Sequence, residues 1–163
     1  MHLNRFVHGA SQVLRERLLL PLRQLSWEEV LVAIAVGVLG GIFPVPLVTS
    51  LVTLAIGYYV RCSAAELVLG STANFFCTPL QFALLPLLAR FMGNVARVNV
   101  DAFTAAALRE SLSAGYTTFL TSTGRMLCYA TMGWFLFAIP AVVVLRFAQN
   151  GITRRQLHKT VSA

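Results

Sequence analysis

Charge is scarce in this sequence. Only 12% of its 163 residues are Asp, Glu, Lys or Arg, and 57% are hydrophobic. Soluble domains contain about 25% charged and about 45–50% apolar residues. A chain of this length exposes much of its surface, so one small core cannot hide this much apolar material from water. The composition excludes a disordered chain and argues against a water-soluble globule. It predicts a membrane protein.

Acidic residues are the rarer charged class, and lysine is almost absent. Only 6 Asp and Glu stand against 13 Lys and Arg, and Lys159 is the single lysine, so the net charge is +7. The arginines lie singly between apolar runs, which is typical of membrane-interface anchors and not of a nucleic-acid surface. The predicted partner is therefore the lipid bilayer, and no nucleic acid is expected.

The sequence also lacks the patterns of common enzymes and metal sites. Its three cysteines, Cys62, Cys77 and Cys128, have no C-x-x-C spacing, and we interpret them as small buried hydrophobes. The three histidines lie near the ends of the chain, outside every apolar run. No nucleophile motif or phosphate-binding loop occurs. We predict no enzymatic activity, no cofactor and no metal site.

Three stretches without charge are long enough to cross a bilayer. Residues 30–60, 67–89 and 126–145 provide 31, 23 and 20 uncharged residues, and a spanning helix needs about 20. We therefore predict an all-α integral membrane protein whose membrane domain covers residues 27–149.

The C-terminal part of this domain is predicted to contain two helices. Residues 102–123 are rich in Ser and Thr and are expected to form an amphipathic polar helix. A tight turn at Gly124 and Arg125 then leads into a terminal span at 126–147. Residues 150–163 are expected to form a basic tail.

Two prolines interrupt the first uncharged run. Pro44 and Pro46 remove two backbone donors and restrict the residues before them to extended geometry. Each half of the run has 14 residues, or about 21 Å of helix, which is less than the hydrocarbon thickness of about 30 Å. Residues 27–60 are thus predicted to form a re-entrant hairpin or a bent span. Its elbow must face protein or water, because lipid cannot satisfy unpaired backbone groups.

The second run repeats this arrangement. Pro79 interrupts residues 64–92, and Asn74, Thr78 and Gln81 beside it can hydrogen-bond freed backbone groups. We predict a second proline-broken hairpin here, either re-entrant or kinked, and the likeness of the two elbows leaves an internal repeat open. The predicted structural elbow residues are Gly40, Gly41, Phe43, Pro44, Pro46 and Pro79.

The elbows have two interpretations. Half-helices that meet inside a membrane expose polar backbone to a substrate in transporters, and a helix starting at Leu47 would offer N–H groups to an anion. Alternatively, the elbows are packing devices only. On the first interpretation the substrate-binding residues are Thr49, Asn74, Thr78 and Gln81, with Arg61 or Arg125 supplying charge.

Two charged residues beside the apolar runs also have two interpretations each. Glu66 follows Arg61 and precedes an apolar run, so it is either a buried charge inside the membrane or an interfacial residue in the first turn of a helix. Arg125 either points into a polar cavity lined by Thr117, Thr121 and Ser122 or anchors a turn at the interface.

The N-terminal segment is basic and amphipathic. Apolar residues recur every three or four positions over residues 1–18, with arginines on the other side. Residues 1–26 are predicted to form a helix in the headgroup plane and a linker. A transit peptide is the alternative, whereas the internal charges argue against a signal peptide. Ser26 and Glu29 form a capping box that begins the first membrane helix.

Basic residues near both ends are typical of the cytoplasmic side of a membrane protein. We predict that both termini are cytoplasmic. If both hairpins return to their starting side, Arg61, Arg90 and Arg97 stay there as well. A bacterial inner membrane is the predicted location, with an organellar membrane as the alternative.

Three segments carry recognisable motifs: G-V-L-G-G-I-F-P-V-P at residues 37–46, G-S-T-A-N-F-F-C-T-P at 70–79 and G-W-F-L-F at 133–137. Together they resemble the domain of unknown function 2062 family of small multi-pass membrane proteins, over residues 27–155. The resemblance implies a membrane architecture with proline elbows and a final aromatic-rich helix. It implies no particular reaction.

The chain departs from that family's pattern at two places. The glycine that usually follows the second proline is Leu47, and the family's Asn-Pro pair is split into Asn74 and Pro79. The proline-x-proline elbow is also similar, more weakly, to the re-entrant hairpin of DedA-like lipid-translocating proteins. Those proteins place acidic residues beside the elbow, whereas no acid lies between Glu29 and Glu66 here.

The predicted role is transport or translocation of a lipid or small anionic solute through the proline-elbow half-helices. Because the chain is short, we expect a homodimer to enclose such a path. The alternative is a non-catalytic accessory or scaffold subunit of a larger membrane complex. That role would need exposed apolar side chains such as Phe135 and Phe137.

Overall fold

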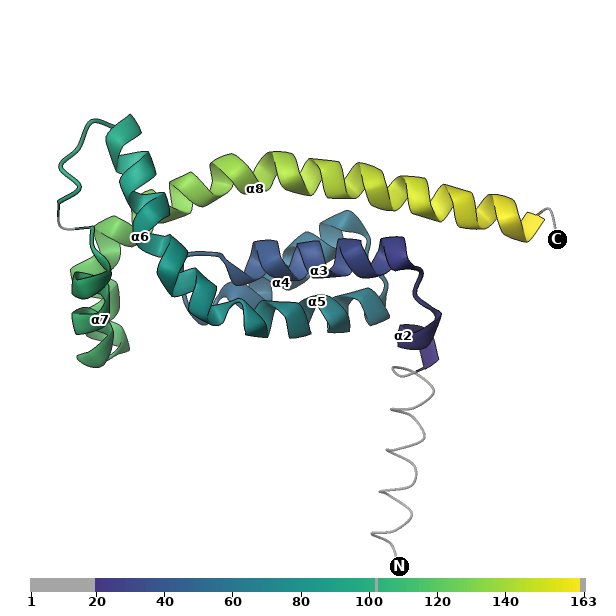
Figure 1. The fold of residues 1–163 in the computed structure, drawn as a ribbon, viewed down its shortest axis with the longest axis horizontal. Coiled ribbons are helices and arrows are strands. Elements are labelled where there is room, and N and C mark those ends of the chain that lie inside the picture. The colour runs from purple at the N-terminus through teal and green to yellow at the C-terminus, as the bar shows by residue number, and fades with distance from the viewer. Residues whose placement is uncertain (1–19, 102, 162–163) are drawn as a thin grey trace, which may run out of the picture.

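The computed structural model describes residues 20–101 and 103–161, and every regular element in these ranges is a helix (Figure 1). The all-α class is therefore confirmed, while the predicted helix at residues 1–18 lies outside the described ranges. The helices are α2 (Leu20–Gln24), α3 (Trp27–Gly41), α4 (Thr49–Val60), α5 (Ala64–Phe76), α6 (Thr78–Val95), α7 (Ala105–Ser113) and α8 (Tyr116–Val161).

The first uncharged run folds as a hairpin. Helix α3 begins at the predicted capping box, where the Glu29 carboxylate accepts a hydrogen bond from the Ser26 N–H at 2.7 Å. The chain reverses between Gly41 and Thr49, and α4 packs beside α3. Leu47 makes this reversal with φ of 69°, in the left-handed region that favours glycine. A single bent span is therefore excluded for this run.

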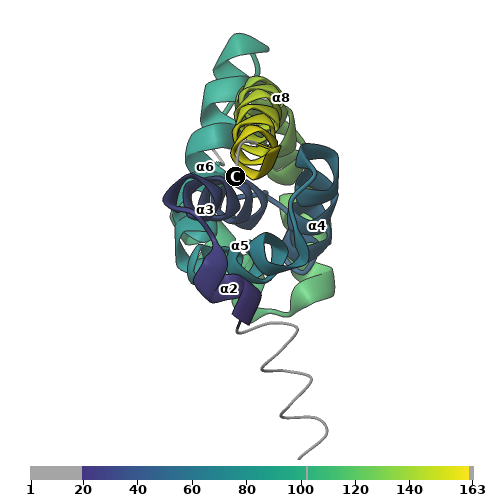
Figure 2. The ribbon, with the colours of Figure 1, turned by 90° about the vertical axis from the view of Figure 1, so that its right-hand side faces the viewer.

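Glycines let α3 approach both of its neighbours closely. A Cβ atom on Gly37 would lie 2.1 Å from the Gly70 carbonyl oxygen of α5. A Cβ atom on Gly40 would lie 2.0 Å from Thr53 Oγ1 of α4. Helices α3, α4 and α5 thus form a three-helix unit, and α8 runs alongside it (Figures 1 and 2). Small residues at helix contacts are the usual device for close packing in membranes.

The second uncharged run is broken and bent, in agreement with the kinked form of the prediction, and its two halves do not pack side by side as a hairpin. Helix α5 ends at Phe76, α6 begins at Thr78, and the two helices meet at 67°. Helix α5 packs on α3 and α4, whereas α6 runs along α8. Pro79 occupies the first turn of α6, where its missing N–H removes no helical hydrogen bond. It therefore starts a new helix in a new direction.

The predicted turn at Gly124 and Arg125 is wrong, because α8 continues through both residues. The break comes earlier, at Gly115, whose φ of 108° suits glycine and ends α7. The predicted polar helix is thereby divided between α7 and the first turns of α8. Residues 150–161 also belong to α8 and are not a separate tail.

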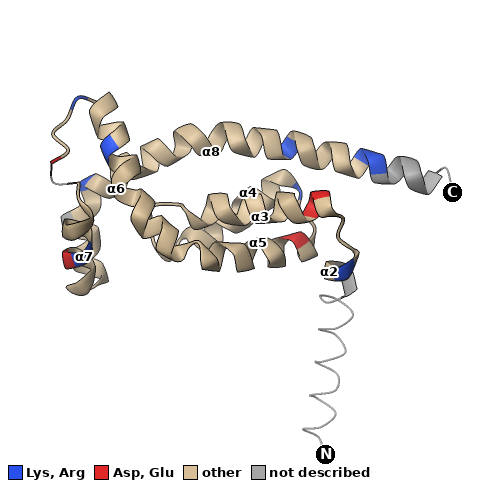
Figure 3. Cartoon of the chain, viewed as in Figure 1, with Lys and Arg blue, Asp and Glu red and all other residues tan. Residues whose placement is uncertain are grey.

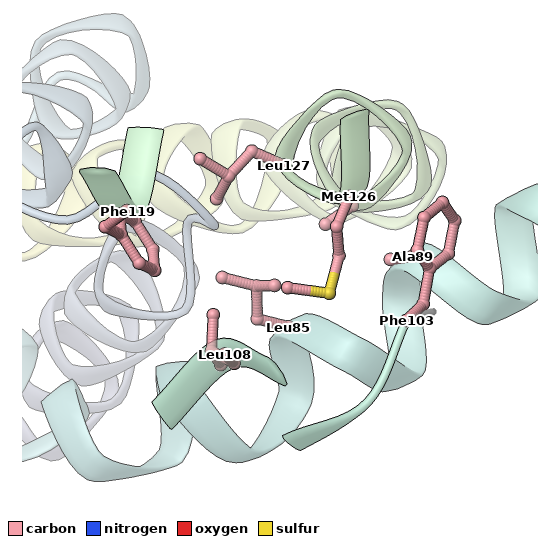
Figure 4. Packing of buried hydrophobic residues seen from close by; sticks show 8 residues of the cluster. Leu85, Ala89, Phe103, Leu108, Phe119, Met126 and Leu127 are labelled. Carbon is pink, nitrogen blue, oxygen red and sulfur yellow. The ribbon is translucent and has the colours of Figure 1, made fainter. Parts of the chain in front are cut away.

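Two apolar clusters join the helices, and α8 contributes to both. Through them α8 sets the position of the α3–α4 hairpin relative to α6 and α7. The first cluster (Figure 4) contains Leu85, Ala89, Phe103, Leu108, Phe119, Met126, Leu127 and Ala130. The second contains Val32, Val36, Ile56, Val60, Trp134, Ala138 and Ile152.

Among the described residues, one helical segment is long and apolar enough to cross a membrane alone, namely Thr123–Arg155 of α8. Helices α5 and α6 pass the same test only when they are counted together as one bent span. Helix α4 is apolar but has only 12 residues. The lengths thus allow up to two crossings.

Candidate functional site

Three carbonyl oxygens in or just before the α3–α4 elbow accept hydrogen bonds from side chains on other helices. Pro44 and Pro46 leave this backbone without regular helical partners, so side-chain donors replace them. We call the following six residues the elbow cluster. Its pairs are Gln81 Nε2 to Phe43 O at 2.7 Å, Trp134 Nε1 to Leu39 O at 3.0 Å and Tyr116 Oη to Pro46 O at 3.2 Å.

The cluster is also packed by aromatic and apolar contacts. The rings of Phe43 and Trp134 meet edge to face with their centroids 4.9 Å apart. Pro44 is fully buried. Gly41 lies against α5, where a Cβ atom would come 2.7 Å from Cys77 Cβ. Protein side chains thus satisfy three carbonyl oxygens at the elbow, as a packing device requires.

The four polar residues predicted near the elbow fall into two groups. Asn74 and Gln81 are buried, and Asn74 Nδ2 lies 3.5 Å from Ser50 Oγ, so α5 and α6 each bring one amide to the elbow. Thr49 is half-buried at the start of α4. Thr78 is exposed, and its hydroxyl donates to the Phe75 carbonyl oxygen at the end of α5. Thr78 therefore bonds locally across the α5–α6 break and does not face the elbow cluster's carbonyl oxygens.

The two arginines predicted to supply charge belong to opposite ends of the molecule. Arg61 lines a pocket with Arg146, whereas Arg125 lines a different pocket. Arg125 and Arg146 are separated along the continuous helix α8 by about 30 Å. No single cavity can therefore use both Arg61 and Arg125.

Helix α8 also binds the other end of the hairpin. The start of α3, the end of α4 and the start of α5 lie beside the C-terminal half of α8. The elbow lies farther toward the N-terminus of α8, where Trp134 contacts Leu39. We call the following six residues the hairpin base. Its pairs are Arg146 Nη1 to Tyr59 O at 2.6 Å, Gln149 Nε2 to Glu66 Oε1 at 2.8 Å and Arg155 Nη1 to Glu28 Oε1 at 3.1 Å.

Charged residues gather toward the two ends of the molecule and leave its middle free of charge (Figure 3). One end is the hairpin base. The other end, which we call the α7 end, contains α7 and Arg125 of α8. Ala89 of α6 packs with Met126 and Leu127, so its neighbour Arg90 lies at the α7 end with Arg125. The predicted grouping of Arg90 with Arg61 required the second run to return to its starting side, whereas α6 leads away from α5 toward α7.

Glu66 is both buried and part of a helix cap. It is 2% exposed, and its Oε2 accepts a hydrogen bond from the Ser63 N–H at 2.5 Å in the first turn of α5. Its second oxygen is bound by Gln149, and no ion pair joins it to Arg61 in the part of the chain that the structure describes. Glu66 is thus a buried residue in the first turn of a helix, and its depth in a membrane stays a prediction.

Gln149 is a residue that sequence reasoning missed. Its side chain is 5% exposed, and its Oε1 has no hydrogen-bond partner among the described residues. The available signal was its position three residues after Arg146, on the same side of a helix. The predicted terminal span ends at residue 147 and the predicted tail begins at residue 150, so Gln149 lies between them without a predicted role.

The cysteines differ in environment. Cys77 is buried, Cys62 is half-buried and Cys128 is exposed, so the predicted burial is wrong for Cys128. Burial raises the pKa of the Cys62 thiol to about 12, and the nearby Glu66 carboxylate adds to this effect. The Cys62 thiol therefore stays protonated at neutral pH. Within the described ranges, no three His, Cys, Asp or Glu side chains are grouped to hold a metal ion.

A pocket of about 500 Å³ lies between α7 and α8 at the α7 end. It contains Arg125, in agreement with one interpretation of that residue, but its threonines are Thr118 and Thr123. Glu110 lines the same pocket, and no ion pair between Glu110 and Arg125 occurs in the described structure. The pocket is thus open to a polar group.

Comparison of the chain with protein-family models, curated proteins and solved structures found no match. The family resemblance therefore stays a prediction. One geometric observation bears on it, because Leu47 stands where that family carries glycine and has the positive φ that favours glycine. The functional argument rests on the residues and their contacts.

Proposed function

We propose that the chain is an integral membrane protein in which α8 and the bent pair α5–α6 cross the bilayer. Helices α3 and α4 form a re-entrant hairpin beside them. In this arrangement the hairpin base lies at one membrane surface and the α7 end at the other. The elbow lies near the middle of the bilayer.

The exposure of the apolar side chains supports immersion in lipid. Only 28% of the most apolar window of α8 is buried inside the protein, whereas the core helix of a soluble protein is mostly buried. Large apolar side chains are exposed on the other helices too, and water would disfavour such a surface. Examples are Leu51, Phe75, Phe76, Leu87, Ile139 and Val144.

The contacts along α8 support the proposed depths of the elbow and of the hairpin base in the bilayer. Residues 126–145 are uncharged and provide about 30 Å of helix, which matches the hydrocarbon thickness. Trp134 lies near the middle of this stretch and binds Leu39 next to the elbow. Arg146 follows its end and binds Tyr59 at the end of α4. The hairpin therefore enters and leaves at the same level.

Cysteine labelling tests this topology. Single cysteines would replace Arg61, Arg97, Arg125 and Arg155 in a chain whose natural cysteines are removed, and a membrane-impermeant maleimide would be added to either side. We expect positions 61 and 155 to react from one side and positions 97 and 125 from the other. Labelling of positions 61 and 155 from opposite sides would exclude the re-entrant hairpin. Labelling of all four positions from one side would exclude the two crossings.

We further propose that this membrane domain translocates a lipid or small anionic solute. The observation that carries this proposal is the pair of buried amides, Asn74 and Gln81, beside the elbow at mid-depth. Buried polar groups in a membrane are costly and commonly mark a substrate path. Three carbonyl oxygens at the elbow each accept a hydrogen bond from one side chain. If a polar group of the substrate replaced these side chains as the donor, a polar path would open at the elbow.

Flux in vesicles tests the translocation role. Wild-type protein in vesicles should speed the transfer of fluorescent phosphatidylglycerol or of a small anion between the two sides. Asn74→Leu keeps the bulk but removes the amide, so we expect loss of flux with retained folding. The control is Thr72→Val on the exposed face of α5, which should keep wild-type flux. Wild-type flux no faster than that of protein-free vesicles, or full flux in Asn74→Leu, would contradict the proposal.

The second candidate role is a scaffold subunit of a membrane complex or homodimer. It is favoured by the exposed apolar side chains of Phe135, Leu136 and Phe137 near the middle of α8. Purification in mild detergent distinguishes the two roles. A stoichiometric large partner that is lost in Phe135→Ala/Phe137→Ala, without loss of folding, would favour the scaffold.

A further inference from the structure

Two arginines line one small pocket at the hairpin base. Arg61 at the end of α4 and Arg146 of α8 enclose, with Tyr58 and Tyr59, a cavity of about 350 Å³. Among the described residues, no acidic side chain lines this cavity. Two cations that face the same space repel each other unless an anion lies between them.

The chain holds both arginines in place through backbone contacts. Arg61 ends α4 with φ of 69°, and its N–H donates to the Tyr58 carbonyl oxygen at 3.1 Å. Arg146 donates one Nη1 hydrogen bond to the Tyr59 carbonyl oxygen, and its guanidinium carbon lies 5.6 Å from the centre of the Tyr59 ring. A guanidinium has five N–H donors, so most donors of Arg146 remain for a ligand.

The acids at this end are engaged elsewhere. Glu28 pairs with Arg155, and Glu66 is bound by Ser63 and Gln149. The side chain of Arg61 has no hydrogen bond or ion pair within the part of the chain that the structure describes. The anion that the pocket needs must therefore come from outside the described protein.

The chemistry of the pocket fits a phosphate group. Arginine forks donate paired hydrogen bonds to phosphate oxygens. Arg146 follows the uncharged stretch of α8, so the pocket lies at headgroup level, where tyrosines are enriched. We propose that Arg61 and Arg146 bind the phosphate of an anionic lipid headgroup, with Tyr58 and Tyr59 beside it. This inference rests on the proposed membrane placement, and it adds that an anionic lipid binds at the hairpin base.

Lipid titration of the full chain tests the site. Delipidated protein in mild detergent would be titrated with short-chain phosphatidylglycerol and followed by native mass spectrometry. We expect Arg61→Gln to weaken binding by about tenfold, the usual effect of losing a charge-assisted hydrogen bond. Arg154→Gln removes the same charge from an exposed position near the same base and should change affinity less than twofold. Equal losses in the two variants would overturn the proposal.

Two further arms make the result specific. Arg61→Lys should recover only part of the affinity, because lysine keeps the charge but not the planar fork. Full recovery would overturn the paired-donor geometry. Phosphatidylcholine should bind at least tenfold more weakly than phosphatidylglycerol, since the two arginines repel its choline cation, and equal binding would overturn the anionic-headgroup assignment. Displacement of the lipid by millimolar inorganic phosphate would overturn the lipid as the source of the phosphate.

The binding result and the flux result are separable. Arginine-dependent binding without any wild-type flux would support the headgroup site and contradict translocation. Wild-type flux with binding that is the same in Arg61→Gln and Arg154→Gln would contradict the headgroup site and support translocation.

Discussion

Replacement of Gly37 by alanine is expected to lower the free energy of unfolding by about 3 kcal/mol, at the upper end of the range for overpacking. The added Cβ would lie 2.1 Å from the Gly70 carbonyl oxygen and 2.9 Å from the Cβ atom of Ala73, both on α5. The first of these atoms is backbone and cannot rotate away. Helix α3 or α5 must therefore shift, and the elbow at the end of α3 must shift with it.

The measurement is unfolding in mixed micelles, with SDS added to a mild detergent and helicity followed by circular dichroism. The matched control is Gly151→Ala on α8, where an added Cβ meets nothing within 4 Å. That variant should gain about 0.5–1 kcal/mol, because alanine loses less backbone entropy than glycine in a helix. Wild-type stability in Gly37→Ala would mean that α3 and α5 do not pack through these glycines.

Replacement of Glu66 by leucine is expected to cost about 3 kcal/mol, the sum of a lost helix cap and a buried amide without a partner. The carboxylate is the acceptor for both the Ser63 N–H and Gln149 Nε2. Gln149 already has one unpartnered oxygen, so Glu66→Leu would leave its whole amide unpaired. Glu66→Gln keeps an oxygen for Ser63 and offers an N–H to Gln149, and should stay within about 1 kcal/mol of wild type.

The same unfolding assay measures both Glu66 variants. Glu28→Leu is the control, because it removes a carboxylate of the same type from the exposed ion pair with Arg155. An exposed pair contributes about 0–1 kcal/mol, so this variant should remain close to wild type. If Glu66→Leu were no less stable than Glu28→Leu, the buried contact with Gln149 would not hold α5 against α8.

The local features of the fold could be predicted because they depend on neighbouring residues. The capping box at Ser26 and Glu29 forms as expected, since its groups lie within one turn. Pro44 and Pro46 interrupt the first run as expected, since proline removes its own backbone donor. The burial of Asn74 and Gln81 near the elbow also agrees with their position beside a break. These effects need no distant part of the chain.

The direction of each break could not be predicted from the same local rules. Pro44 and Pro46 precede a full reversal, whereas Pro79 begins a helix at 67° to the one before it. A proline removes its own backbone donor, but it does not set the direction in which the chain continues. The packing of α3 on α4 through Gly40 and of α6 along α8 selects the outcome. The same packing keeps α8 continuous through Gly124.

The sequence by itself determined the helical class, the scarcity of charge and the helix breaks beside Pro44, Pro46 and Pro79. Tertiary structure alone decided the partners of the buried polar groups. The elbow carbonyls bind donors 38, 70 and 95 residues away, and Glu66 binds a residue 83 positions away. A buried polar group must find some partner, but only the docking of α6 and α8 decides which one. Arg61 and Arg146 share a pocket for the same reason, because α8 brings its end to the base of the hairpin.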